Sequence, residues 1–107
     1  MRRRFQHRVP FPCIRDASLR HLNVIVKRWL PEGRKVGSEW VVRNPMRADT
    51  RPGSFKINLR TGLWADFATG DKGGDVISLA AYLFRLSQVE AARKVASMLA
   101  LSIEGER

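Results

Sequence analysis

The sequence predicts an α+β fold, with a small antiparallel β-sheet packed with about three α-helices. Apolar and polar residues alternate over residues 54–59 and 63–67, which is the period of a half-buried strand. Apolar residues at helical spacing flank this pair, over residues 19–29, 76–84 and 89–99. At 107 residues, the chain is long enough for one domain with a modest core.

The chain is expected to divide into a basic arm and a folded part. The arm covers residues 1–14, which hold four arginines and in which Pro10 and Pro12 break any helical pattern. The folded part covers residues 15–107 as a single unit.

Three helices are expected, over residues 16–30, 75–85 and 87–101. Asp16 or Ser18 provides an N-cap for the first helix. Asp75 follows a glycine-rich turn and is a suitable N-cap for the second. Ser87 precedes the third, and Glu90 three residues later completes the pattern of a capping box.

The sheet is expected over residues 39–68, as a strand at 39–43 followed by a hairpin that turns at Gly62. With Gly62 in the left-handed position, the apolar pairs on one face are Leu59 with Leu63, Ile57 with Ala65, and Phe55 with Phe67. The other face then holds Trp64 and pairs Lys56 with Asp66. This register leaves Trp64 on the wetter face, beside a lysine.

The net charge of +10 is unevenly distributed. Residues 1–72 carry 16 Lys and Arg against 6 Asp and Glu, whereas residues 73–107 carry four of each. The charge therefore favours an anionic partner, with nucleic acid ahead of a membrane surface. The second segment has the composition of a neutral helical support.

Several classes of protein are disfavoured by composition. The single cysteine, Cys13, cannot form an internal disulfide, which is typical of a reducing cytoplasm. No apolar run approaches the roughly 18–20 residues of a membrane span, and no apolar segment follows the arginines at the start as in a secretory signal. A cytoplasmic location without membrane partners is expected.

The central part of the chain also contains an ordered set of short motifs. They are Asn44-Pro45-Met46-Arg47, Pro52-Gly53-Ser54-Phe55, Gly62, Trp64, Asp66-Phe67-Ala68-Thr69 and Gly73-Gly74-Asp75-Val76-Ile77. Over roughly residues 18–100 this order resembles the N-terminal zinc-ribbon domain of bacterial, phage and plasmid DNA primases. There the corresponding motifs are C-P-x-H, a Pro-Ser-Phe strand, a turn glycine, an aromatic residue, C-x-x-C and a glycine-rich turn into an apolar helix.

The four positions that hold zinc ligands in that family differ here, being Asn44, Arg47, Asp66 and Thr69. A structural zinc ion takes four Cys or His ligands in a tetrahedron, and these side chains do not supply them. The resemblance therefore implies a zinc-ribbon-like fold without its metal, and no cofactor is expected.

No arrangement typical of catalysis is evident. The chain has two scattered histidines, one cysteine and no nucleophile paired with a base. In the family that the chain resembles, catalysis resides in a separate domain, which a chain of this length does not contain. The protein is therefore expected not to be an enzyme.

The resulting prediction is a metal-free DNA-binding module that engages single-stranded DNA, in replication or in a mobile element. The residues expected to contact nucleic acid are Arg43, Arg47, Arg51, Lys56, Arg60, Trp64 and Lys72. The cations would hold phosphates, with a strong dependence on salt. Trp64 would stack on a base.

Two other classes of function stay open at this stage. One is a protein-interaction module that docks a replication protein such as a primase, helicase or polymerase, for which weak salt dependence is expected. The other is an RNA-binding accessory protein, which would prefer strands that carry 2′-hydroxyl groups.

Overall fold

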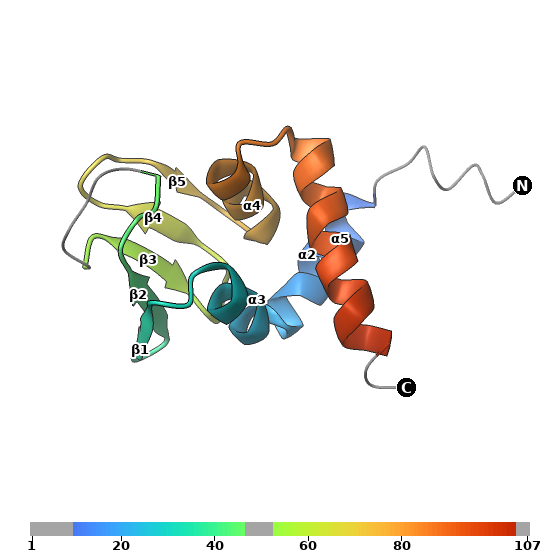
Figure 1. Ribbon diagram of the computed structural model, residues 1–107, viewed down its shortest axis with the longest axis horizontal. Coiled ribbons are helices and arrows are strands. Elements are labelled where there is room, and N and C mark those ends of the chain that lie inside the picture. Colours follow the sequence, from blue (N-terminus) through green and yellow to red (C-terminus); the bar gives the residue numbers. More distant parts are fainter. Residues whose placement is uncertain (1–9, 47–52, 105–107) are drawn as a thin grey trace, which may run out of the picture.

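The computed structural model describes residues 10–46 and 53–104, with side chains described to residue 100. The predictions for Arg47, Arg51 and most of the basic arm lie outside this part of the chain. In chain order the described elements are α2 (Phe11–Arg20), α3 (Leu22–Trp29), β1 (Arg34–Val36), β2 (Glu39–Val42), β3 (Phe55–Asn58), β4 (Trp64–Asp66), β5 (Lys72–Gly73), α4 (Val76–Phe84) and α5 (Gln88–Glu104) (Figure 1). The predicted α+β class is confirmed.

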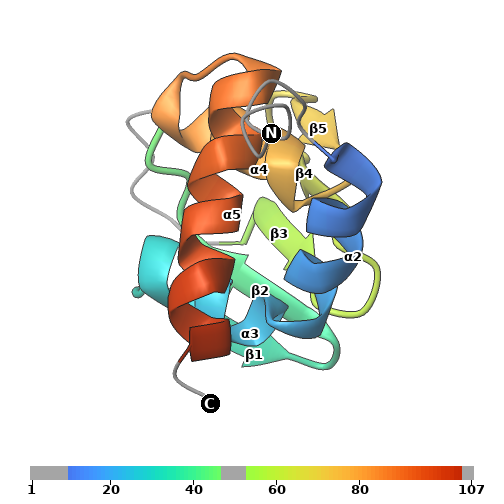
Figure 2. The same cartoon turned by 90° about the vertical axis from the view of Figure 1, so that its right-hand side faces the viewer.

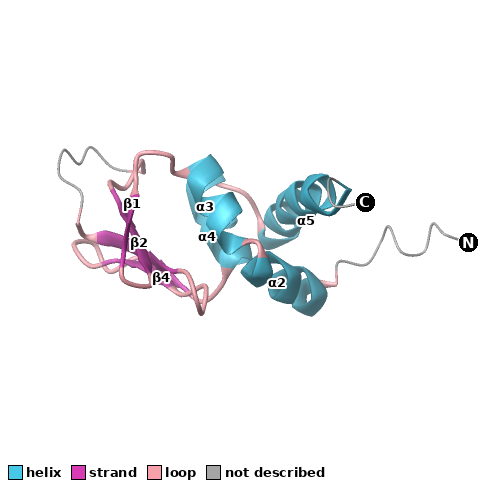
Figure 3. Ribbon diagram, turned by 90° about the horizontal axis from the view of Figure 1, so that it is seen from below, coloured by secondary structure: helices cyan, strands magenta, loops and turns pink. Residues whose placement is uncertain are grey.

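The five strands form one antiparallel sheet in the order β1-β2-β3-β4-β5, so each strand pairs with its neighbour in sequence. All the described helices lie on one side of this sheet (Figure 3). α3 and α4 are the helices nearest to the sheet, and α5 lies on their far side from it (Figure 1). Seen from the helical end, α5 and α2 stand in front of the sheet (Figure 2). We call the side that packs on the helices the inner face, and the other side the outer face.

The hydrophobic core lies between the inner face and the helices. Phe55 and Ile57 of β3 are completely buried, and so are Leu79 and Ala80 of α4. Trp40 of β2 also faces inward, and its Nε1 donates to the carbonyl oxygen of Leu30 (3.0 Å). Trp40 therefore packs against the helices.

The first helical region differs from the prediction. The helix begins at Phe11 and not near Asp16, because Pro10 and Pro12 occupy its start, where a missing backbone N–H breaks no hydrogen bond. The helix is interrupted at His21, just after the Ser18 hydroxyl donates back to the carbonyl oxygen of Arg15 (2.8 Å). The arm therefore ends before residue 11 and not at residue 14.

Both predicted caps near the chain end are confirmed. The Asp75 carboxylate accepts from the backbone N–H of Ser78 (2.8 Å) at the start of α4. Ser87 and Glu90 form a reciprocal capping box before α5, with donor–acceptor distances of 3.0 and 3.1 Å. These local contacts explain why the predicted starts of the last two helices agree with the structure to within one residue, whereas α5 extends to Glu104, beyond the predicted end at residue 101.

At the end of α4, Arg85 adopts a left-handed conformation with φ of 54°. This conformation costs a side-chain-bearing residue about 1 kcal/mol relative to glycine. We expect Arg85→Gly to raise the free energy of unfolding by about 1 kcal/mol in urea titrations. The matched control is Arg93→Gly within α5, which should lower it by about 1 kcal/mol. Destabilisation by both substitutions would contradict this account of the helix end.

The central hairpin has a different register from the predicted one. The observed pairs are Phe55 with Asp66, Lys56 with Ala65, and Ile57 with Trp64. The Asn58 Oδ1 accepts from the backbone N–H groups of Arg60 (2.8 Å) and Thr61 (3.0 Å), which closes a four-residue loop ending at Gly62. The pairing therefore shifts by one residue, and every β4 side chain changes face.

This shift corrects three predictions. Trp64 lies on the inner face and is 4% exposed, so its predicted place on the wetter face is wrong. Asp66 is buried on the inner face as well and is not the cross-strand partner of Lys56. Leu63 and Phe67, which were predicted to be buried, are 55% and 71% exposed.

Among the helices described for this chain, none has the length and apolar character needed to cross a bilayer.

Candidate functional site

The outer face of the sheet carries a row of cations. The strand pairing places Arg34, Val41, Lys56, Ala65 and Lys72 in one line across all five strands. Since directly paired residues of antiparallel strands share a face, the three cations alternate with apolar side chains. Neighbouring strands are about 4.8 Å apart, so successive cations are roughly 10 Å apart. Val41 is only 6% exposed yet lies outside the main core cluster, as expected for a residue on this face.

An exposed aromatic ring lies beside this row. Phe67 follows β4, and its backbone N–H donates to the carbonyl oxygen of Ser54 (2.8 Å), which continues the pairing with the chain before β3. Its side chain is 71% exposed. The Nζ of Lys56 lies 5.6 Å from the centre of the ring, within the range of a cation–π contact. The outer face thus presents a flat apolar ring next to a positive charge.

A groove of ≈ 310 Å³ runs between Phe67 and Leu63 on this face. It is lined by Glu39, Lys56, Asn58, Leu63, Trp64, Ala65, Phe67, Lys72 and Gly73. The small side chain of Ala65 leaves the space open between two larger exposed side chains. The groove combines two lysines, Lys56 and Lys72, with the exposed apolar side chains of Leu63 and Phe67. Lysines can bind phosphates and apolar side chains can stack on bases, so this combination suits single-stranded nucleic acid.

Trp64 supports this groove from the inner face. Its Nε1 donates to the Ser78 hydroxyl of α4 (2.9 Å), and its ring packs on Tyr82 with centroids 4.8 Å apart. Gly73 is required beside it, because a Cβ there would lie 2.4 Å from Trp64 Nε1. A ring this enclosed does not present a face to a base. Phe67 is the exposed aromatic side chain of the groove.

A buried polar network holds the turn that carries Phe67. Asn44 is 1% exposed, and its Nδ2 donates to the Asp66 carboxylate (2.7 Å) and to the Tyr82 hydroxyl (2.9 Å). The other oxygen of Asp66 accepts from the backbone N–H of Ala68 (2.9 Å). The Tyr82 hydroxyl donates in turn to the carboxylate of Asp71 (2.8 Å). These bonds join the loop after β2, the β4–β5 turn and α4.

Burial of the Tyr82 hydroxyl raises its pKa above the usual value of 10.0, although the hydrogen bond from Asn44 acts in the opposite direction. The adjacent Asp71 and Asp66 carboxylates add to the increase. The Tyr82 phenol therefore stays protonated and able to donate throughout the neutral range.

Asn44 and Asp66 are two of the four positions that align with zinc ligands in the resemblance. In the structure the amide of one donates directly to the carboxylate of the other. Thr69 is exposed, and its hydroxyl accepts from the backbone N–H of Asp71 (3.2 Å). These residues do not fit a zinc ion. Over the described residues, no three His, Cys, Asp or Glu side chains gather as a metal site.

The structure brings only some of the predicted contact residues together. Lys56 and Lys72 line the same groove, and Trp64 lies beneath it. Arg60 is exposed in the loop between β3 and β4. Arg43 pairs with Glu32 (3.5 Å) beside a separate pocket of ≈ 230 Å³, so it is not part of the groove.

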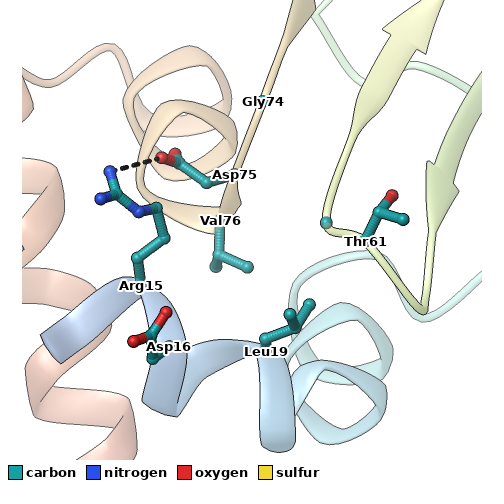
Figure 4. Close-up of a pocket in the computed structure, with 8 residues that line it drawn as sticks. Arg15, Asp16, Leu19, Thr61, Gly74, Asp75 and Val76 are labelled. Atoms are coloured by element: carbon teal, nitrogen blue, oxygen red, sulfur yellow. Dashed lines mark ion pairs between the residues drawn. The ribbon is translucent and has the colours of Figure 1, made fainter. Parts of the chain in front are cut away.

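The glycine-rich turn before α4 forms a third hollow, of ≈ 200 Å³ (Figure 4). Arg15 reaches from α2 to the Asp75 carboxylate, with 3.6 Å between the charged atoms. Asp16 also lines this hollow, whereas Lys72 does not. Two carboxylates at this helix start disfavour phosphate, so the turn has the structural role of a cap that ties α2 to α4.

A scan against models of protein families finds no match to this chain, and a search of curated proteins finds no similar sequence.

The sequence prediction missed Leu63 and Phe67 as surface residues of the groove, and Arg34 as a member of the row of cations. The available signal was Asn58, because an asparagine that precedes a short loop often accepts from the backbone two and three residues later. A four-residue loop closed in that way places Leu63 and Phe67 on the same face as Lys56.

Proposed function

We propose that this protein is a single-stranded DNA-binding module whose contact surface is the outer face of the sheet. The proposal rests above all on Phe67, an aromatic ring that is 71% exposed and lies 5.6 Å from a lysine ammonium group. Leaving such a ring in water is unfavourable, and stacking on a base would cover it. The proposed module is metal-free, since Asn44, Asp66 and Thr69 do not provide the Cys or His ligands of a structural zinc ion.

Electrostatics supports the same surface. Arg34, Lys56 and Lys72 cross the sheet in one row, and none of them takes part in the two ion pairs formed within the described residues. A strand that crosses the sheet along this row could place its phosphates at the cations and a base on Phe67. Arg60, in the loop next to the groove, extends the positive charge.

The test is fluorescence anisotropy with a labelled single-stranded DNA of mixed sequence. Release of counterions from three phosphate contacts is expected to weaken binding roughly 20-fold between about 50 and 200 mM salt. Phe67→Ala should weaken it about 5- to 150-fold by removing one stacked base. Lys56→Glu and Lys72→Glu should each weaken DNA binding relative to the wild type and reduce its dependence on salt.

Two control variants lie on the helical side of the protein. Val24→Ala removes an exposed apolar side chain of α3, and Lys27→Glu reverses a charge on the same helix. Both should leave the affinity within about twofold of the wild type. Tighter binding of duplex DNA would contradict the proposed preference for single strands. Equal losses of affinity in the control variants would contradict binding through the outer face.

A protein partner is the second candidate, and the exposed side chains of Leu63 and Val36 favour it. They add apolar surface on the same side of the sheet as Phe67, at 55% and 51% exposure. No binding to DNA or RNA at about 50 mM salt, together with capture of a replication protein that Phe67→Ala abolishes, would support this alternative. A preference for RNA over DNA of the same sequence would indicate the RNA-binding alternative.

A further inference from the structure

One carboxylate lies in the otherwise basic groove. Glu39 of β2 pairs directly with Asn58 of β3, and both side chains line the groove. Glu39 takes part in neither of the two ion pairs formed among the described residues. A carboxylate beside a phosphate-binding row weakens binding through repulsion unless it accepts hydrogen bonds from the ligand. Its position therefore points to a donor group on the ligand.

Asn58 presents a fixed donor beside this acceptor. Its Oδ1 accepts from the backbone N–H groups of Arg60 and Thr61, at 2.8 and 3.0 Å, so the oxygen is directed at the loop. The amide nitrogen is then the group that can donate to a ligand. Directly paired residues on one face have Cβ atoms about 5 Å apart, so the Glu39 carboxylate and the Asn58 amide can contact a single base.

Leu63 supplies an apolar surface for that base. The backbone N–H of Asn58 donates to the carbonyl oxygen of Leu63 (2.7 Å), which places the two residues side by side at the hairpin end. Leu63 is 55% exposed and lines the groove. A base that lies on Leu63 would have its edge toward Asn58 and Glu39. Phe67, at the other end of the groove, would be available to another base.

We propose that this end of the groove selects guanine in single-stranded DNA, an inference that rests on the proposed function. Glu39 accepts from the N1–H and the N2 amino group of the base, and Asn58 donates to its O6. Guanine has two donors side by side on its Watson–Crick edge, next to an acceptor. Adenine and cytosine present one amino donor there, and thymine presents one N–H between two carbonyl oxygens that repel a carboxylate.

The test uses labelled oligothymidylates of about 8 nucleotides, a length within the usual site size of single-strand-binding domains. One central position is guanine, hypoxanthine, adenine, cytosine or thymine. The guanine oligonucleotide should bind at least ~5-fold more tightly than those with adenine, cytosine or thymine. Hypoxanthine lacks the N2 amino group and should fall between guanine and adenine.

Glu39→Gln should abolish the preference for guanine over hypoxanthine without weakening binding to the all-thymine strand, because a carboxylate near the phosphates is removed. Glu32→Gln is the matched control and should keep the preference, since Glu32 lies outside the groove. Equal and salt-dependent binding of all five oligonucleotides would overturn the guanine inference while the proposed function stands. Absence of binding by all five at about 50 mM salt would overturn both.

Discussion

Replacement of Trp64 by alanine is expected to lower the free energy of unfolding by about 3–5 kcal/mol, the usual cost of truncating a buried tryptophan. The indole is 4% exposed, packs on Phe55 and Tyr82, and donates to Ser78. Its loss leaves a cavity between the sheet and α4 and removes the hydrogen bond that the indole donates to the Ser78 hydroxyl. Urea unfolding followed by circular dichroism measures the effect.

The matched control for Trp64→Ala is Leu63→Ala, one residue earlier in the chain and on the opposite face. Leu63 is 55% exposed, so this variant should change the free energy of unfolding by about 0.5 kcal/mol or less. The two neighbouring substitutions thus report directly on which face each side chain occupies. A large loss for Leu63→Ala with a small loss for Trp64→Ala would show that the hairpin has the register with Trp64 outside.

The second large effect is expected for Asn44→Ala, at about 2–3 kcal/mol of destabilisation. The substitution removes a buried amide that donates to the Asp66 carboxylate (2.7 Å) and to Tyr82 (2.9 Å), and hydrogen bonds to a buried charged group are among the most stabilising. The backbone N–H of Met46 also loses its acceptor, the Asn44 Oδ1. Urea unfolding again provides the measurement.

Asn23→Ala, at an exposed position of α3, is the matched control for Asn44→Ala and should be within about 0.5 kcal/mol of the wild type. Asn44→Ala should also weaken DNA binding, because the network fixes the turn that presents Phe67. Unchanged stability in Asn44→Ala would show that the network does not hold the turn.

The parts of the fold that could be predicted from sequence were those determined by local contacts. Asp75, Ser87 and Glu90 fixed the starts of the last two helices through bonds that span three residues. The alternation of β3 also identified its inner face correctly, with Phe55 and Ile57 buried. Nothing beyond neighbouring residues was needed for these predictions.

The register of the hairpin depended on contacts that the sequence does not display. The alternation of Leu63, Ala65 and Phe67 suggested that these three side chains lie on the inner face. The side chains that do lie there are Trp64, which donates a hydrogen bond to Ser78 of α4, and Asp66, which accepts one from Asn44. Burial of the larger ring, together with closure of the loop by Asn58, favours the observed pairing. The short strands β1 and β5 were missed because two or three residues carry no detectable periodicity.

The candidate site could be predicted only in part, because it depends on the register of the hairpin and on the short edge strands. Lys56 and Lys72 were among the predicted contact residues, and the structure places both of them in the lining of the groove. Trp64 was predicted to be the exposed aromatic residue, whereas the exposed ring beside Lys56 is that of Phe67, which is a direct result of the one-residue shift. Arg34 was not considered, because its place in the row depends on a strand that the sequence did not reveal.

The sheet separates the buried residues that stabilise the fold from those that face solvent, and this affects which substitutions the protein can tolerate. The inner set, including Phe55 and Ile57, is constrained by packing, whereas Glu39, Leu63 and Phe67 border solvent. A library randomised at the outer positions alone should therefore yield a high fraction of folded members. Selection from such a library could alter ligand preference step by step, with little need for compensating substitutions in the core.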